Sequence, residues 1–201
     1  MAGATARAKE LGFQVYEFGA DCDGTMPDGF VRVLRARGVQ GVIFFYSAPT
    51  GLMAGFPWEE FATIEIDYGQ CEPVLHTVCL DHYMTLTGAL TRLQGLGHRR
   101  IGLFLIRSKD ERITHKLSAA FQRSAGSIGN VPLLIFEQVE AGGFLRWHHR
   151  HKPDLVIGHV VEAVAWLQRP GVWVPEQTAF FNLSWTEGKR PCAGLDWRLE
   201  L

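Results

Sequence analysis

Three histidines within four residues, His148, His149 and His151, form the most conspicuous chemical group of the sequence. Imidazole and thiolate ligands hold Zn²⁺ when they share one helix face, at i, i+3 or i+4 spacing. Only His148 and His151 have that spacing, and no cysteine or carboxylate stands at ligand spacing beside them. We therefore expect a solvated helix end here and no metal site.

The common catalytic and cofactor-binding motifs are absent from the sequence. It contains no G-x-S-x-G elbow for a serine nucleophile. It also lacks G-x-G-x-x-G and G-x-x-x-x-G-K-[ST], whose backbone amides would hold phosphates. A hydrolase or isomerase on an α/β sheet would have no catalytic constellation here. The sequence therefore predicts a protein that is neither an enzyme nor dependent on a cofactor.

Composition narrows the class further. The chain has 201 residues, is 47% hydrophobic and carries a formal net charge of -1, so it can bury a full core and has no basic excess for nucleic acid. No apolar run approaches the roughly 18 residues of a membrane span, and no secretory signal is visible. The four cysteines show no CxxC spacing, and we expect Cys79 to be a buried thiol. These features predict a cytoplasmic chain without a membrane partner.

Short β-branched or aromatic runs alternate with stretches of helical periodicity. The expected strands are residues 13–18, 41–46, 62–66, 76–80, 101–106, 132–136, 154–157 and 178–181. The clearest helix is 85–96, with apolar side chains on one face and Gly97 at its end. Alternating strands and helices predict parallel sheets with helices on both faces. Ligands of such sheets bind beyond the carboxyl ends of the strands. The loops at 46–51 and 108–114 are therefore the first candidates for a ligand-binding site.

Both ends of the sequence are expected to be truncated. Residues 4–11 predict a helix that leads into the strand at 13–18, although no earlier strand precedes it. Residues 198–201 have the pattern of a helix start without the helix body.

Four segments in order carry a resemblance to a known family. They are AKELGFQVYEF at 8–18, RARGVQGVIF at 35–44, VCLDHYMTLTGALTRLQGLGHRRIGL at 78–103, and W-x-x-x-x-K-P-D-x-V-I followed by GVWVPE within 147–183. Together they resemble the effector-binding core of the LacI/GalR transcriptional regulators and span nearly the whole chain. LGHRRIG, with an acidic residue sixteen positions before Gly97, is the most specific of them.

The resemblance implies a two-lobed, type I periplasmic-binding-protein-like α/β fold. The N-terminal lobe would cover residues 1–98 with a return at 196–201, and the C-terminal lobe would cover 99–195. A small molecule, typically a carbohydrate, would bind between the lobes and control operator binding. The core would form a homodimer, and operator DNA would be bound by an N-terminal helix-turn-helix head that these residues lack. A solute-binding protein of the same fold, serving a transporter, is the alternative function.

The sequence departs from the family at three ligand positions. Leu117 stands where the family has an arginine in R-x-x-G-F, and His159 and Val160 stand in place of an Asn-Asp pair. Ser184 replaces the acidic residue that typically holds sugar hydroxyls. Either the effector is not a typical sugar, or the cleft no longer senses a small molecule.

Polar and aromatic side chains at strand ends remain as candidate effector ligands. Aromatic rings can stack on sugar faces, while Asp81 and Arg112 offer charge-assisted hydrogen bonds. The predicted effector-binding residues are Tyr46, Asp81, Arg112, His115, His159, Ser184 and Trp185.

Overall fold

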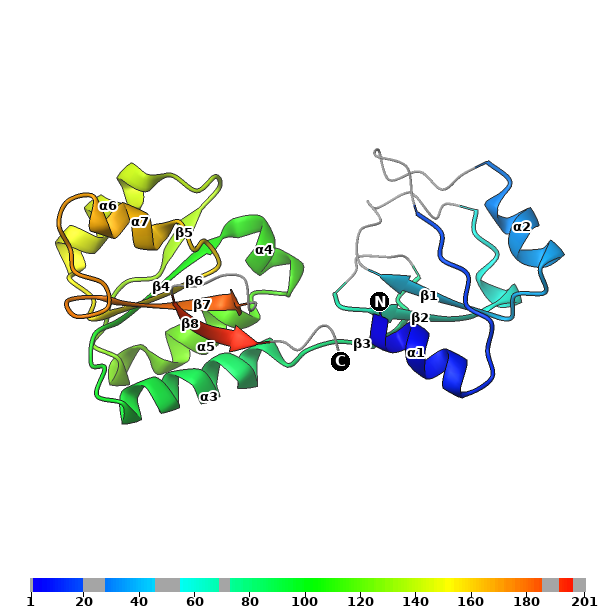
Figure 1. Ribbon diagram of the computed structural model, residues 1–201, viewed down its shortest axis with the longest axis horizontal. Helices are drawn as coiled ribbons and strands as arrows, with labels where there is room; N and C mark the ends of the chain where they lie inside the picture. The colour runs from blue at the N-terminus through cyan, green and yellow to red at the C-terminus, as the bar shows by residue number, and fades with distance from the viewer. Residues whose placement is uncertain (1, 20–27, 46–54, 69–72, 186–191, 197–201) are drawn as a thin grey trace. The chain divides into compact units, whose positions relative to one another are not determined.

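The structure is a computed structural model that describes residues 2–19, 28–45, 55–68, 73–185 and 192–196 (Figure 1). The chain divides into two compact units. Unit 1 comprises residues 1–80 and 200–201, and unit 2 comprises residues 81–199.

Unit 1 contains a three-stranded parallel sheet in the order β1-β2-β3. Its strands are β1 (Gly41–Phe45), β2 (Ala62–Ile66) and β3 (His76–Val78), and its helices are α1 (Ala2–Glu10), α2 (Phe30–Ala36) and the 3-10 turn η1 (Trp58–Glu60). The buried cluster of this unit is small. It consists of Phe30, Leu34, Phe56 and Phe61.

Unit 2 contains a five-stranded parallel sheet in the order β5-β4-β6-β7-β8. Its strands are β4 (Ile101–Ile106), β5 (Leu134–Phe136), β6 (Leu155–Gly158), β7 (Ala179–Trp185) and β8 (Ala193–Asp196). Its helices are α3 (His82–Gly95), α4 (Arg107–Arg112), α5 (Lys116–Ser124), α6 (Ala141–His151) and α7 (Ala163–Gln168), with the 3-10 turn η2 (Ala125–Ser127).

Helices cover both faces of the unit 2 sheet. Figure 1 shows α3 and α5 together on one face and α6 and α7 on the other, and each pair is in contact. The central strands β4 and β6 are apolar along their length, as a sheet with two covered faces requires. On the α6 and α7 side, Phe104 packs against Phe144 and Phe180 in the buried core. Gly158 makes room for that core, since an added Cβ would lie 2.1 Å from Cε1 of Phe104.

Two of the sequence motifs meet at the amino ends of β4 and β6. Asp154 Oδ2 accepts hydrogen bonds from the backbone N–H groups of Arg99 (2.8 Å) and Arg100 (2.9 Å). The Arg100 guanidinium in turn donates to the backbone carbonyls of His151 and Lys152. The K-P-D and G-H-R-R segments therefore fix the register of adjacent strands, at the end of the sheet where ligands do not bind.

The predicted fold class, α/β with parallel sheets and helices on both faces, is confirmed, and β2 and β4 have the expected bounds. The strand expected at 13–18 is wrong: these residues are exposed, and none of the described strands pairs with them. Strand β8 was not expected. Cys79 is exposed rather than buried, because it follows the last residue of the short edge strand β3.

The lobe boundary expected at residues 98–99 stays a prediction. It differs from the division into compact units because α3 packs against α5 and so belongs to unit 2. The start of α3 is set by Asp81, whose side chain accepts a hydrogen bond from the N–H of Met84 at 3.0 Å. Of the expected return segment at 196–201, only Asp196 lies within the described residues.

Candidate functional site

The strand order of unit 2 identifies one edge of its sheet as the place to look for a ligand. The chain leaves β4 to form β5 on one side and then returns to form β6 on the other side. Such a reversal leaves a crevice outside the carboxyl ends of the two strands, where open α/β sheets bind ligands. Helix α4 follows β4 directly, and Figure 1 shows it at the end of the sheet to which the arrowheads of β7 and β8 point. We call this end of unit 2 the carboxyl edge.

His159 is the first residue after β6, in the loop that leads to α7. Its Nδ1 lies 3.2 Å from Oγ of Ser184, within hydrogen-bond distance. The backbone N–H of Ser184 donates to Oδ1 of the fully buried Asn182 at 2.8 Å. The imidazole and the hydroxyl are therefore held at fixed positions by two adjacent strands.

Asp110 on α4 organises the turn into α5. Its side chain is only 2% exposed, and it accepts hydrogen bonds from His115 Nδ1 (3.2 Å) and from the N–H of Ser118 (3.2 Å). His115 and the preceding Thr114 adopt left-handed backbone conformations with φ of 58° and 54°. The His115 side chain remains 62% exposed. The buried carboxylate therefore orients an imidazole that is accessible to a ligand.

The electrostatic environment of His159 joins these groups into one site. Burial is the main cause that lowers the pKa of His159 to about 4, and the positive charge of Lys109 adds to this effect. His82 and Arg112 also lower the pKa, whereas Asp110 opposes them. His159 is therefore neutral at physiological pH, in surroundings with an excess of positive charge.

The structure brings four of the predicted effector residues to the carboxyl edge: Arg112, His115, His159 and Ser184. Trp185 is the half-buried last residue of β7, beside Ser184. Asp81 caps α3, and Tyr46 lies outside the described residues. The role of all seven in effector binding remains a prediction.

Sequence reasoning missed three polar residues at this edge, namely His82, Lys109 and Asp110. His82 is buried, next to the predicted Asp81. Lys109 and Asp110 lie inside the loop that the sequence singled out at 108–114. An acidic residue one turn before His115 was the available signal, but burial of Asp110 is visible only in the structure.

One of the three histidines at the end of α6, His148, makes a contact within the fold. His148 Nε2 lies 2.9 Å from Oγ1 of Thr178, and burial, aided by the charge of His149, lowers the pKa of His148. Within the described part of the chain, no group of three His, Cys, Asp or Glu side chains is placed to hold a metal ion.

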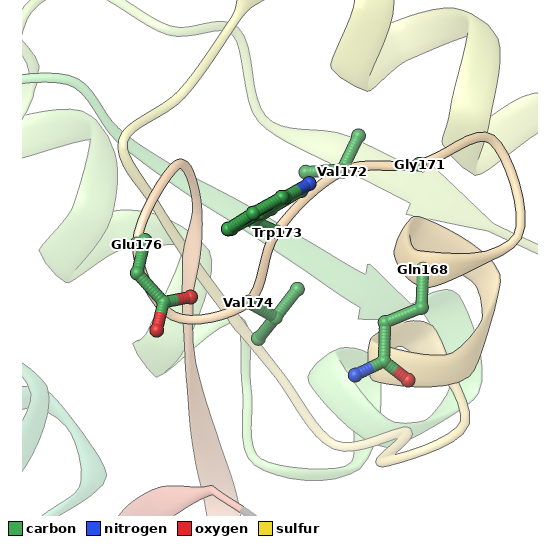
Figure 2. A pocket seen from close by; sticks show the side chains of 6 residues that line it. All are labelled: Gln168, Gly171, Val172, Trp173, Val174 and Glu176. Atoms are coloured by element: carbon green, nitrogen blue, oxygen red, sulfur yellow. The ribbon is translucent and has the colours of Figure 1, made fainter.

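A hollow in unit 2 lies at the opposite end of the sheet, before β7 (Figure 2). It has a volume of about 340 Å³ and is lined by Gln168, Gly171, Val172, Trp173, Val174 and Glu176. Gln168 is the last residue of α7, and the other five residues belong to the connection between α7 and β7. The carboxyl edge instead combines side chains from α4, β7 and the loop after β6, and we consider it the better candidate.

No protein-family model and no curated protein matches this sequence. None of the helices in the described residues is both long and apolar enough to cross a membrane.

Solved structures match over most of the chain. A LacI-family regulatory protein from Chloroflexus aggregans is 16% identical with a TM-score of 0.69, covering 90% of this chain and 70% of its own. A periplasmic binding protein/LacI transcriptional regulator from Alkaliphilus metalliredigens, in complex with D-xylulofuranose, is 14% identical with a TM-score of 0.61, covering 89% and 69%. A sugar-binding LacI-family regulator from Escherichia coli, in complex with phosphate, is 15% identical with a TM-score of 0.60, covering 90% and 70%. The chain therefore has the periplasmic-binding-protein-like α/β fold found in LacI-family transcriptional regulators.

Proposed function

We propose that this chain is the effector-binding core of a LacI-type transcriptional regulator, in which a small molecule binds at the carboxyl edge of unit 2. The observation that carries the proposal is the convergence of fixed polar groups at the reversal of strand order. His159 and Ser184 lie within hydrogen-bond distance of each other, and Asp110, on the helix that follows β4, orients His115. Two regulators of this fold hold a small ligand, D-xylulofuranose in one and phosphate in the other.

The proposed effector site includes Tyr46, Asp81, Arg112, His115, His159, Ser184 and Trp185. Neutral His159 and the Ser184 hydroxyl would exchange hydrogen bonds with ligand hydroxyls, and Trp185 would supply an aromatic surface. Arg112 would add a charge-assisted hydrogen bond. No acidic residue stands at position 184 to hold a sugar hydroxyl pair, so the preferred ligand differs from a typical neutral hexose.

Regulation requires that the ligand favour one state of the protein. A ligand that binds two states equally shifts nothing, however tightly it binds. The proposed regulator is a cytoplasmic homodimer whose operator contacts are made by a helix-turn-helix outside these residues. A sedimentation experiment at micromolar concentration tests the dimer, and a monomer would contradict that part of the proposal.

Thermal-shift measurements test whether a small molecule binds at this site. Purified chain is heated with a panel of sugars, phosphorylated sugars, organic acids and nucleobases, and at least one class is expected to raise Tm by several degrees. The shift should be lost in His159→Ala and Ser184→Ala and kept in Gln168→Ala, which alters the hollow of Figure 2. A shift that survives both edge substitutions would contradict the proposed site.

Chromatin immunoprecipitation distinguishes a transcriptional regulator from a solute-binding protein that serves a transporter. The gene product is tagged in its host, and DNA that copurifies with it is sequenced. We expect enrichment at a small number of promoters that changes when the stabilising ligand is supplied. Uniform recovery of DNA from the whole genome, without enrichment at promoters, would favour the solute-binding alternative. Such a protein shares the ligand site but binds no operator.

A further inference from the structure

An exposed tryptophan, Trp173, lies at the amino end of the unit 2 sheet, opposite the carboxyl edge. Trp173 is 69% exposed, whereas its neighbours Val172 and Val174 pack against the buried core. The N–H of Trp173 donates to Oε1 of Gln177 (2.9 Å), and its carbonyl accepts from the N–H of Gln177 (2.8 Å). A fixed backbone therefore holds a large apolar ring in solvent, where its burial by a partner would be favourable.

The hollow beside Trp173 offers space for a side chain of such a partner. Its volume of about 340 Å³ is comparable to that of the smallest ligand pockets. Figure 2 shows the Trp173 ring in the middle of the lining residues. The valines give the hollow apolar walls, while Gln168 and Glu176 are its polar groups. A single aromatic or branched aliphatic side chain suits this combination.

A cluster of exposed cations lies at the same end of the sheet. Its members come from the segment before β4 and from the end of α6: Arg99, Arg100, Arg150 and Lys152. The two segments are in contact, because the Arg100 guanidinium donates to the backbone carbonyls of His151 and Lys152. None of the four forms an ion pair with a carboxylate in the described part of the chain. The cluster is therefore a surface of uncompensated positive charge.

Thr178, just before β7, connects the hollow to this cluster. Its N–H donates to the carbonyl of Trp173 (3.3 Å), and its Oγ1 donates to the carbonyl of Pro153 (3.1 Å). The same Oγ1 lies 2.9 Å from Nε2 of His148 on α6. Pro153 directly follows Lys152, a member of the cluster. Because β6 and β7 are neighbouring strands, the hollow and the cations lie side by side at the amino end.

We infer that the amino end of unit 2 binds an acidic segment of a partner protein, with one apolar side chain of that segment in the hollow beside Trp173. The acidic side chains would lie over the cation cluster. Glu176 lines the hollow, so a carboxylate is not expected inside it. Tryptophan and arginine are enriched among the residues that dominate interface affinity. This surface is separate from the proposed effector site, and the inference does not depend on that site.

The size of the cluster favours a protein partner over a nucleic acid. Binding to a nucleic-acid backbone draws its affinity from counterion release and can involve about 6–10 phosphate contacts. The cluster holds four lysine and arginine side chains, which one short acidic segment can match. The hollow adds a contact that a phosphate backbone would not use.

The first test selects binders from a displayed library of random peptides, with the purified chain as bait. Peptides that also bind the double variant Trp173→Ala/Lys152→Gln are removed. Both substitutions change exposed side chains, so the variant should keep its fold, as circular dichroism can check. We expect the remaining peptides to carry acidic residues around one aromatic or branched aliphatic residue. No enrichment, or enrichment of neutral or basic peptides, would overturn the inference.

The second test measures the affinity of an enriched peptide by fluorescence polarisation. Trp173→Ala should weaken binding at least roughly tenfold, as for an interface anchor. Lys152→Gln should weaken it about threefold, as for an exposed ion pair, and added salt should reduce the affinity of the wild type. Lys109→Gln removes an exposed charge from α4 at the carboxyl edge and should have no effect. Equal affinities in all variants would contradict the proposed surface.

Two other occupants of this surface give distinct results. A single-stranded oligonucleotide that binds more tightly than the peptide and responds to the same substitutions would assign the surface to nucleic acid. A dimer that Trp173→Ala dissociates in sedimentation would assign it to a second copy of this chain. Either result would overturn the acidic-protein inference, and neither would bear on the ligand panel that tests the effector site.

Discussion

The two units differ in how completely their sheets are covered. Unit 2 surrounds five strands with helices on both faces and buries a large cluster around Phe104, Phe144 and Phe180. Unit 1 has three strands, and its buried cluster in the described residues contains only Phe30, Leu34, Phe56 and Phe61. Since buried apolar area dominates folding free energy, most of the stability is expected in unit 2. The proposed site therefore lies on the unit that can hold side chains rigidly.

Exposed apolar side chains strengthen this contrast. In unit 1, the segment 11–18 exposes Leu11 (58%), Phe13 (63%) and Tyr16 (42%). These residues gain little from burial, so we expect unit 1 to open at a lower free energy than unit 2.

The largest effect on stability is expected when a large side chain is removed from the unit 2 core. Phe144→Ala removes a side chain with 0% exposure and should lower the free energy of unfolding by about 3–5 kcal/mol. Phe56→Ala, the matched change in unit 1, should cost less and mainly raise amide exchange within unit 1. Urea denaturation and native-state hydrogen exchange measure the two effects. Equal losses spread over the whole chain would refute the assignment of stability to unit 2.

The next effect is a pH dependence that originates in unit 2. The pKa of His159 is about 4 when folded and near 6.5 when unfolded, so the unfolded chain takes up this proton first as pH falls. The stabilisation is complete above about pH 6.5 and is lost towards pH 4, by up to about 3 kcal/mol. The half-buried His148, whose pKa is also lowered, contributes in the same direction.

Chemical denaturation between pH 4 and 7 measures this dependence. His159→Asn should flatten the slope, because asparagine keeps a polar group but does not titrate. His76→Asn, at an exposed position on β3 of unit 1, is the matched control and should keep the wild-type slope. A slope unchanged in His159→Asn would show that the imidazole is not buried as described.

A smaller effect is expected at the junction of β4 and β6. Asp154→Ala leaves the N–H groups of Arg99 and Arg100 without their acceptor, which should cost about 2 kcal/mol. Asp28→Ala, at an exposed position of unit 1, should have no measurable effect. Thermal unfolding followed by circular dichroism compares the two, and a similar Tm for both variants would contradict the role given to the K-P-D motif.

The smallest effect is expected for the exposed ion pair of unit 1. Arg35 donates two hydrogen bonds to Glu60, which raise the pKa of Arg35 and lower that of Glu60. Solvent screens such pairs, so Arg35→Met should leave Tm unchanged within experimental error. A decrease as large as that of Asp154→Ala would mean that unit 1 depends on surface charge more than its burial suggests.

The elements of unit 2 were largely predictable from the sequence, because strands that are covered on both faces form continuous apolar runs. The run 101–106 is apolar throughout and became β4 with the expected bounds. Strand β8 was missed, since Ala193–Asp196 contains a glycine and an acidic residue and has no β-branched side chain. In unit 1 the run 13–18 has strand-like residues but pairs with no described strand, and local preference alone does not form a sheet.

The candidate site was predictable only in part. Strand ends pointed to His159 and Ser184, but their hydrogen bond depends on the order of β6 and β7 in the sheet. Lys109 and Asp110 were missed because no periodic pattern distinguishes a buried aspartate from an exposed one on a short helix. The sequence predicts Asp81 as an effector-binding residue, and in the structure its side chain caps α3.

The central claim is that a small molecule binds at the carboxyl edge of unit 2. The most direct measurement is a ¹H–¹⁵N NMR titration with the first ligand that stabilises the chain. We expect chemical-shift changes concentrated at residues 107–118, His159 and Ser184. Changes concentrated around Trp173 and Glu176, or confined to unit 1, would contradict it.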